Sequence, residues 1–118
     1  IGGYRVQGTD QESAETILTD AAVLEEAGAN ILVVECVPSS LGEKLSQRLK
    51  MPVIGIGAGV NTDGQILVLH DVLGISETIP SFSKNFLQEN HSIESAISAY
   101  VLAVRNKAFP TLEHSFSD

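Results

Sequence analysis

The chain has 118 residues, which is enough for one domain of modest size. Its formal net charge is −8 with only 7 lysines and arginines, so the composition argues against a nucleic-acid partner, whose phosphates need basic side chains. No apolar run approaches the roughly 20 residues of a membrane-spanning helix, so we expect no membrane partner either. The single cysteine, Cys36, cannot form an internal disulfide, and we expect a reducing, cytoplasmic setting.

The first part of the chain predicts a strand, a helix and a second strand. Tyr4–Gln7 lies between glycines and is a short strand candidate. Thr9 or Asp10 can cap the helix that follows, and Gly28 can end it. The apolar stripe of this helix comprises Ala14, Ile17, Leu18, Ala21, Leu24 and Ala27. Ile31–Val34 is a continuous apolar run, typical of a parallel strand that is covered on both faces.

A second β-α unit follows directly. Ser39 or Ser40 can cap an amphipathic helix. The apolar stripe of this helix comprises Leu41, Leu45 and Leu49. Val53–Ile56 is the next predicted strand, and Ile66–Leu69 is a fourth. The connection between these two strands is too short for a helical crossover, so we expect only a turn or one helical turn at Asn61–Gly64.

The remainder of the chain predicts one clear helix. An irregular stretch precedes it, with a short helix expected near Lys84–Gln88. The last helix has Glu94 at its start and Arg105 at its end, as the helix dipole favours, and Pro110 stops it. Its apolar stripe comprises Ile93, Ala96, Ile97, Tyr100, Val101 and Val104. Thr111–Asp118 is interpreted as a polar tail.

These elements predict an α/β fold with a parallel sheet. Four strands, each followed by helical or loop material, suit either a small doubly wound sheet or half of a (β/α)8 TIM barrel, which needs roughly 250 residues. The chain begins Ile-Gly-Gly-Tyr, without a starting methionine, and this abrupt start favours the half-barrel. We expect residues 1–118 to form a single unit.

Glu35 is the leading candidate for chemistry. A carboxylate directly after buried aliphatic residues is costly unless it is paired, protonated or used. At the C-terminal end of a parallel strand it would lie partly buried in the mouth of the sheet, where its surroundings can turn it into a general base. An ion pair or a cap at the strand end is the structural alternative.

Cys36 and the histidines give weaker signals. Cys36 should face the opposite side of the sheet from Glu35. A nucleophilic thiol with His70 as its base is conceivable, but we favour a small, buried, apolar cysteine. His70 and Asp71 could shuttle a proton or bind a metal ion, yet adjacent strand residues point apart, so we favour a structural histidine. No function is indicated for the two other histidines, His91 and His114.

The glycine-rich stretch Gly55–Gly59, with the sequence GIGAG, has two interpretations. A backbone nest followed by one helical turn at Thr62–Gln65 would suit a phosphate, and barrels often bind phosphate with their last loops. Alternatively, the glycines only allow tight packing where the strand becomes a loop. The residues alone leave both interpretations open.

Four motifs, taken together, resemble one family closely. They occur in the order GGYRVQG, ILVVECVP, PVIGIGAG-x3-DGQILVLHD-x-LG and EHSF. The chain resembles the ketopantoate hydroxymethyltransferases (3-methyl-2-oxobutanoate hydroxymethyltransferases) from Gly2 to Phe116. That family has a (β/α)8 barrel about twice as long as this chain. The resemblance therefore implies a C-terminal half-barrel, with the four predicted strands as barrel strands five to eight.

The resemblance implies an enzyme of pantothenate and coenzyme A biosynthesis. The family transfers a one-carbon unit from 5,10-methylenetetrahydrofolate to 3-methyl-2-oxobutanoate and yields 2-dehydropantoate. A magnesium ion binds the oxoacid, a glutamate removes the C3 proton, and the enolate attacks the methylene carbon. That glutamate maps onto Glu35 in the ECVP motif. The family also forms large homo-oligomers, so we expect a homo-oligomer or pairing with an N-terminal half-barrel.

The resemblance also implies that part of the site is missing. The family's magnesium ligands, and the serine and lysine that hold the oxoacid, belong to the N-terminal half. We therefore expect no metal ligands in this chain and no activity from it in isolation. Two alternatives remain: a barrel enzyme that binds a phosphate ester through Gly55–Gly59, and a non-catalytic half-barrel that self-associates.

Overall fold

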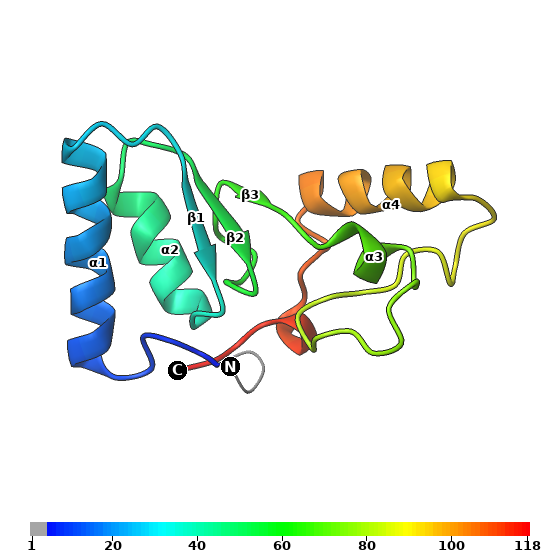
Figure 1. The fold of residues 1–118 in the computed structure, drawn as a ribbon, viewed down its shortest axis with the longest axis horizontal. Helices are drawn as coiled ribbons and strands as arrows, with labels where there is room; N and C mark the ends of the chain where they lie inside the picture. The colour runs from blue at the N-terminus through cyan, green and yellow to red at the C-terminus, as the bar shows by residue number, and fades with distance from the viewer. Residues whose placement is uncertain (1–4) are drawn as a thin grey trace.

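The computed structural model describes residues 5–118, which form an α/β fold with one small parallel sheet (Figure 1). The elements in chain order are α1 (Gln11–Glu26), β1 (Leu32–Glu35), α2 (Ser39–Arg48), β2 (Val53–Ile56), β3 (Gly64–Gln65), α3 (Leu69–Val72), α4 (Ile93–Arg105) and the 3-10 helix η1 (Leu112–His114). Within the described part of the chain, no helix is long and apolar enough to cross a membrane.

The sheet has the strand order β1-β2-β3, and all its strands are parallel. Val33 lies opposite Ile54 and Glu35 opposite Ile56, so β1 and β2 finish at the same end of the sheet. In Figure 1 the heads of both arrows lie at this end, near the last residues of the chain. It is the C-terminal end of the sheet, where parallel α/β folds bind their ligands.

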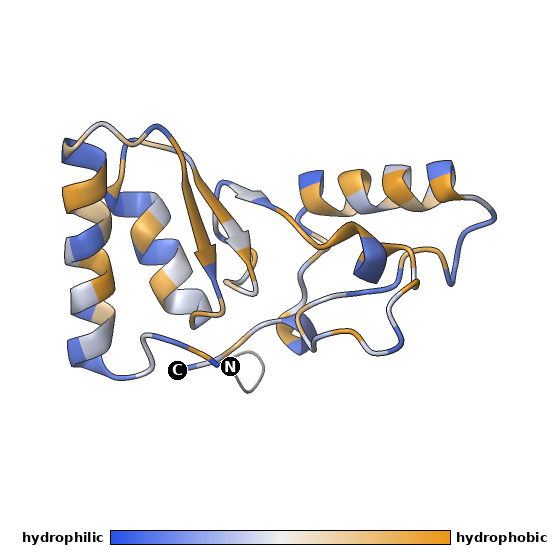
Figure 2. Ribbon diagram, viewed as in Figure 1, coloured by the Kyte–Doolittle hydropathy of each residue, from blue (hydrophilic) through white to orange (hydrophobic). Residues whose placement is uncertain are grey.

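Helices α1 and α2 pack together over one face of the sheet. The core between helices and strands comprises Leu18, Ala21, Val34, Val37, Leu41, Leu45, Val53 and Ala58. Both strands are apolar along most of their length (Figure 2), so each can bury one face here. The predicted start of α1 is confirmed, because the Asp10 carboxylate accepts a hydrogen bond from the Ser13 N–H at 2.7 Å. Gly28 follows the end of α1 with a φ of +108°.

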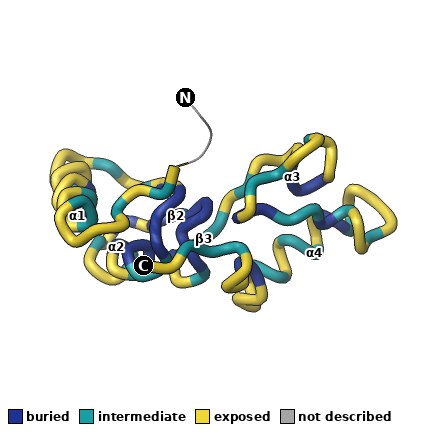
Figure 3. Tube along the Cα trace, turned by 90° about the horizontal axis from the view of Figure 1, so that it is seen from below, coloured by how far each residue is buried: buried dark blue, intermediate teal, exposed yellow. Residues whose placement is uncertain are grey.

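The other face of β1 is open to solvent. Val33 is 54% exposed, and Glu35 on the same face is also exposed. The prediction of a strand covered on both faces is therefore wrong for β1, since both helices that pack on the sheet lie on its other face. The paired strand β2 is mostly buried, while much of α1 is exposed (Figure 3). Helices on one face only suit a barrel wall better than a doubly wound sheet.

A second group of elements extends away from the sheet. We call residues 11–65 the sheet lobe and residues 69–109 the helical lobe. The helical lobe has its own core, which comprises Val72, Leu73, Phe86, Ala96 and Phe109. Between the lobes lies a junction cluster of Cys36, Ile56 and Phe82, against which Leu67 and Phe116 pack. Leu67 also packs against the core of the helical lobe, so it links the two.

Two of the four predicted strands do not form as expected. Ile66–Leu69 is not a strand: the N–H of Ile66 still donates to the Gly55 carbonyl at 3.0 Å, but the chain then leaves the sheet and Leu69 begins α3. Of the predicted strand Tyr4–Gln7, Tyr4 lies outside the described residues and the rest forms no strand. Gln7 makes one link to the sheet lobe, from its N–H to the Cys36 carbonyl at 2.8 Å.

Three helix predictions also need correction. Pro38 occupies the cap position of α2, so Ser39 and Ser40 lie inside its first turn and cap nothing. No helix forms at Lys84–Gln88. Helix α4 forms as predicted, and Ser92 caps it. Ala96 of the predicted stripe is buried, and Tyr100 and Val104 pack against the core of the helical lobe. Ile93, Ile97 and Val101 of the stripe are exposed, so the predicted stripe is only partly buried.

Candidate functional site

Glu35 is the last residue of β1 and lies at the C-terminal end of the sheet. Its side chain is exposed, so the expectation of a partly buried carboxylate is wrong for this chain. No hydrogen bond or ion pair of the Glu35 carboxylate is found among residues 5–118. The carboxylate is therefore free to meet a ligand on the uncovered face of the sheet.

The backbone after Glu35 is hydrogen-bonded to the end of β2 and the residue that follows it. The N–H of Cys36 donates to the Ile56 carbonyl at 2.9 Å, and the N–H of Val37 donates to the Gly57 carbonyl at 3.1 Å. Cys36 has a φ of +53°, in the left-handed region that residues with a Cβ adopt at a cost of about 1–2 kcal/mol. These hydrogen bonds hold Cys36 in that conformation, which turns the chain from β1 toward α2.

The Cys36 thiol is a core group in this structure. Its side chain is 3% exposed and packs with Ile56, the residue opposite Glu35 in the sheet, and with Phe82. The predicted strand alternation of Glu35 and Cys36 is not confirmed, because Cys36 leaves the strand conformation with a φ of +53°. Burial raises the pKa of the Cys36 thiol, and the negative charge of Glu35 raises it further. A protonated, buried thiol is a poor nucleophile, which favours the structural interpretation of Cys36.

A hollow of about 250 Å³ runs along the unpaired edge of β1, beside Glu35. Its walls are mainly apolar, with Ile17 and Leu24 from α1 and Val33 from β1. Gln7 and Glu35 are among the polar groups that line it. The hollow thus combines an apolar wall, a free strand edge and the candidate carboxylate.

The stretch Gly55–Gly59 is buried throughout and packs against protein atoms. Gly59 has a φ of +84°, and a Cβ there would lie 2.5 Å from the Ser39 hydroxyl oxygen. A Cβ on Gly57, which has a φ of +68°, would lie 3.0 Å from the Phe82 ring. These glycines are needed for close packing. Because the loop is buried against α2 and Phe82, it presents no open phosphate cradle within residues 5–118.

His70 and Asp71 lie in α3 and not at a strand end, so that expectation is wrong. Asp71 is buried and accepts a hydrogen bond from the Ser76 hydroxyl at 2.7 Å. The imidazole of His70 is exposed. The Asp71 carboxylate therefore ties the end of α3 to the next segment, and the structure separates it from Glu35 by element and by lobe.

The two other histidines lie outside the sheet. His91 is exposed in the segment before α4. His114 belongs to η1, where its Nδ1 atom accepts a hydrogen bond from the Thr111 N–H at 3.3 Å. Neither residue contributes to the C-terminal end of β1.

The metal expectation can be tested against the side chains themselves. Within residues 5–118, no group of three or more His, Cys, Asp or Glu side chains could hold a metal ion. The described residues therefore do not fit a magnesium site.

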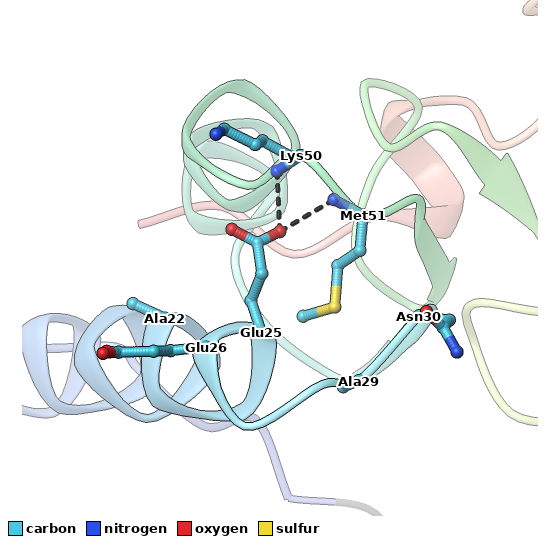
Figure 4. A pocket seen from close by; sticks show the side chains of 7 residues that line it. All are labelled: Ala22, Glu25, Glu26, Ala29, Asn30, Lys50 and Met51. Carbon is cyan, nitrogen blue, oxygen red and sulfur yellow. Dashed lines mark hydrogen bonds between the residues drawn. The ribbon is translucent and has the colours of Figure 1, made fainter.

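Glu25 is a tied carboxylate that the sequence analysis missed. Its Oε2 atom accepts hydrogen bonds from the backbone N–H groups of Lys50, at 2.7 Å, and Met51, at 2.8 Å (Figure 4). It lines a hollow of about 610 Å³ at the edge where the strands begin, opposite Glu35. An acid in the last turn of a helix opposes the helix dipole, and that was the available signal. Since both contacts are to backbone, the role of Glu25 is structural.

Comparison with known proteins decides the family. The family model described as "Ketopantoate hydroxymethyltransferase" matches residues 1–112 of the chain. The chain belongs to this family. Membership agrees with the motif resemblance, including the ECVP motif that contains Glu35.

Curated members of the family resemble almost the whole chain. A 3-methyl-2-oxobutanoate hydroxymethyltransferase of Shewanella sp. (strain MR-4) is 58% identical over an alignment of 118 residues, which covers 99% of this chain and 45% of the relative. A protein of the same name from Alkalilimnicola ehrlichii is 56% identical over 117 residues, 98% of this chain and 42% of the relative. The Buchnera aphidicola protein of that name is 51% identical over 117 residues. The chain thus spans less than half the length of these relatives.

Proposed function

We propose that this chain carries the general base, Glu35, of a hydroxymethyl transfer to 3-methyl-2-oxobutanoate. The one-carbon donor in this proposal is 5,10-methylenetetrahydrofolate, and the product is 2-dehydropantoate. The observation that carries the proposal is the place of Glu35 at the C-terminal end of β1, where its carboxylate is exposed. Within residues 5–118 this carboxylate has no partner and lies on a face that no helix covers. Family membership supports the choice of substrate and reaction.

The chemistry asked of Glu35 is removal of one proton. The carboxylate takes the proton from C3 of the oxoacid, beside the carbonyl, and leaves an enolate. The enolate carbon forms a bond to the donor's methylene carbon, and water supplies the hydroxyl oxygen as the two C–N bonds of that carbon break. Tetrahydrofolate leaves with two new N–H bonds, whose protons come from C3, by way of Glu35, and from water. The residues that follow Glu35 contribute by holding its backbone, through Cys36 and Val37.

Magnesium and most substrate contacts belong, in this proposal, to the part of the relatives that this chain does not span. We propose that residues 5–118 are one side of a (β/α)8 barrel, because parallel strands with helices on one face are what a barrel wall has. The free edge of β1 and the exposed Val33 would meet the other half.

The biological setting is proposed on the same basis. We propose that the protein works as a homo-oligomer or paired with an N-terminal half-barrel, because the uncovered sheet face needs a cover. A cytoplasmic location is proposed from the single, free cysteine, Cys36, which fits a reducing compartment.

The decisive test measures exchange of the C3 proton of 3-methyl-2-oxobutanoate in heavy water with magnesium present. The protein to use is a chimera in which the N-terminal portion of the Shewanella relative precedes this chain. We expect Glu35→Gln to lower exchange by about 10²-fold or more, because the amide cannot accept the proton. Glu26→Gln, an exposed carboxylate at the opposite end of the sheet lobe, should leave exchange unchanged.

Two outcomes would contradict the proposal. Normal exchange by the Glu35→Gln chimera would remove Glu35 from the role of base. Exchange by the 118-residue chain alone, at the rate of the chimera, would show that the chain needs nothing from the N-terminal portion.

A further inference from the structure

We infer that Phe116 is a positioning residue for Glu35: it fixes the N-terminus of α2 and, through it, the turn that carries Glu35. This inference rests on the proposed function, because it gives Phe116 a part in the same reaction. Nothing in the EHSF motif suggested this from the sequence, where Phe116 served only as a marker of the family.

The first observation is a backbone clamp. The carbonyl oxygen of Phe116 accepts a hydrogen bond from the Ser39 N–H at 2.9 Å. The same oxygen accepts a second hydrogen bond from the Ser39 hydroxyl at 3.2 Å. The Ser40 hydroxyl donates to the carboxylate of Asp118. Thus the first two residues of α2 are both held by residues 116–118.

The second observation is the packing of the Phe116 ring. The ring lies edge-on to Phe82, with centroids 6.4 Å apart. Phe82 is buried in the junction cluster with Cys36 and Ile56, and Phe116 packs against that cluster. Ile56 is the residue opposite Glu35 in the sheet, and Cys36 is its neighbour in the chain. The side chain of Phe116 therefore covers the groups that flank Glu35.

The third observation is the short, buried segment through which a displacement of Ser39 would reach Glu35. Only Cys36, Val37 and Pro38 separate Glu35 from Ser39, and all three are buried. A buried, hydrogen-bonded turn has little room to absorb a displacement, so movement at Ser39 reaches Glu35. Because the carboxylate has no partner of its own within residues 5–118, its backbone sets where it lies.

Ser39→Pro tests the hydrogen bonds to the Phe116 carbonyl separately from the packing of the Phe116 ring. Ser39 is the first helical residue of α2, a position that tolerates proline because its N–H has no partner inside the helix. Proline there removes both donors to the Phe116 carbonyl and leaves the junction cluster unaltered. Ser39→Ala removes only the hydroxyl donor, and it still tests the hydrogen bonding if the proline variant does not fold. Leu112→Ala, in the same terminal segment, is the matched control because Leu112 is 93% exposed.

The first readout is the rate at which a thiol reagent modifies Cys36, the single cysteine, in the 118-residue chain. When the clamp is lost, the cover over the junction cluster opens more often, and we expect the Ser39→Pro rate to rise about tenfold or more. Ser39→Ala should give a smaller rise, and Leu112→Ala none. Urea unfolding of each variant separates local opening from loss of global stability. Equal rates in all four proteins would overturn the inference.

The second readout is proton exchange from the oxoacid by the chimera described above. A misplaced base should lower kcat, by about tenfold or more for Ser39→Pro, while KM changes little. A change in KM with kcat intact would overturn the positioning role. If Glu35→Gln retains exchange, the proposed function fails. If Glu35→Gln abolishes exchange but Ser39→Pro leaves both kcat and the thiol rate unchanged, only the inference about Phe116 fails.

Discussion

The imidazole of His114 is held by its neighbours in a position that changes its pKa. It lies against the ring of Phe109, with centroids 4.9 Å apart. Its Nδ1 atom is 2.8 Å from the Thr111 hydroxyl oxygen and accepts a hydrogen bond from the Thr111 N–H. Burial lowers the pKa of His114, Glu113 opposes that shift, and the positive charge of Lys84 adds to it. The folded state therefore favours the neutral imidazole.

This preference predicts a pH dependence of stability. The pKa of His114 is lowered from 6.5 on folding, so the stabilisation is present above pH 6.5 and is lost as the pH falls through the lowered value. We expect the free energy of unfolding in urea to decrease between about pH 7 and pH 5.5, a window in which carboxylates remain charged. His114→Asn keeps an acceptor near the Nδ1 position without this titration, and it should flatten the decrease. An unchanged slope in that variant would contradict the prediction.

At the residue scale, the sequence predicted where Glu35 lies in the fold better than it predicted how exposed Glu35 is. The position of Glu35 at a strand end follows from the apolar run before it, and the strand confirms it. Its exposure could not be predicted, because whether a strand is covered depends on elements outside the local sequence. The roles of Glu25 and Phe116 were missed for a similar reason. Each acts through contacts with residues far away in the chain, and local patterns do not identify those partners.

At the scale of elements, α2 and the loop after β2 lie in close contact. Gly42 faces that loop, and a Cβ there would overlap the carbonyl oxygen of Ala58. Ala58 is part of the core with Leu41 and Leu45. The absence of a side chain at Gly42 thus sets the distance between the helix and the glycine-rich loop.

Gly42→Ala tests this contact against helix propensity. Alanine is more favourable than glycine in a helix by up to about 1 kcal/mol, so this substitution would stabilise the protein if Gly42 were exposed. The overlap with a backbone carbonyl should dominate, because overpacking in a core costs about 1–3 kcal/mol. We expect a lower urea midpoint with an unchanged m-value. Lys44→Ala, at an exposed position of the same helix, is the control, and a Gly42→Ala variant as stable as the original chain would contradict the argument.

The elements that the sequence predicted well are those with a complete local signal. Helix α1 has a cap, a stripe and a terminal glycine, and β2 lies between Pro52 and the glycine loop. Ile66–Leu69 has the apolar composition of a strand, but β3 ends at Gln65. Apolar composition alone could not reveal that Leu67 would pack between the lobes instead.

At the scale of the whole molecule, the chain is more extended than a compact domain of its length. Its radius of gyration is 14.8 Å, against about 13.5 Å expected for a single compact unit. The extension comes from the helical lobe, which contacts the sheet lobe mainly through the junction cluster (Figure 1). Apolar side chains are exposed on both lobes, including Val33 on β1 and Ile97 on α4.

These exposed surfaces predict that the isolated chain self-associates. An unpaired strand edge beside an apolar face is a template for pairing with another chain. Sedimentation velocity should show a mean mass that rises with protein concentration. Val33→Lys, on the open face of β1, should make this rise smaller. Val23→Lys, at an equally exposed position on α1, is the control. A monodisperse monomer at all concentrations would contradict the prediction.

The aromatic rings of the helical lobe give the molecule an optical property of its own. Tyr100 lies edge-on to Phe86 and to Phe109, with centroids 5.3 Å and 6.0 Å away. The chain has no tryptophan and only 2 tyrosines, so near-ultraviolet circular dichroism arises from very few groups. A tyrosine band that Tyr100→Phe abolishes would report on the helical lobe, while the Cys36 thiol reports on the junction. The helical lobe and the junction cluster could then be followed separately as the chain unfolds.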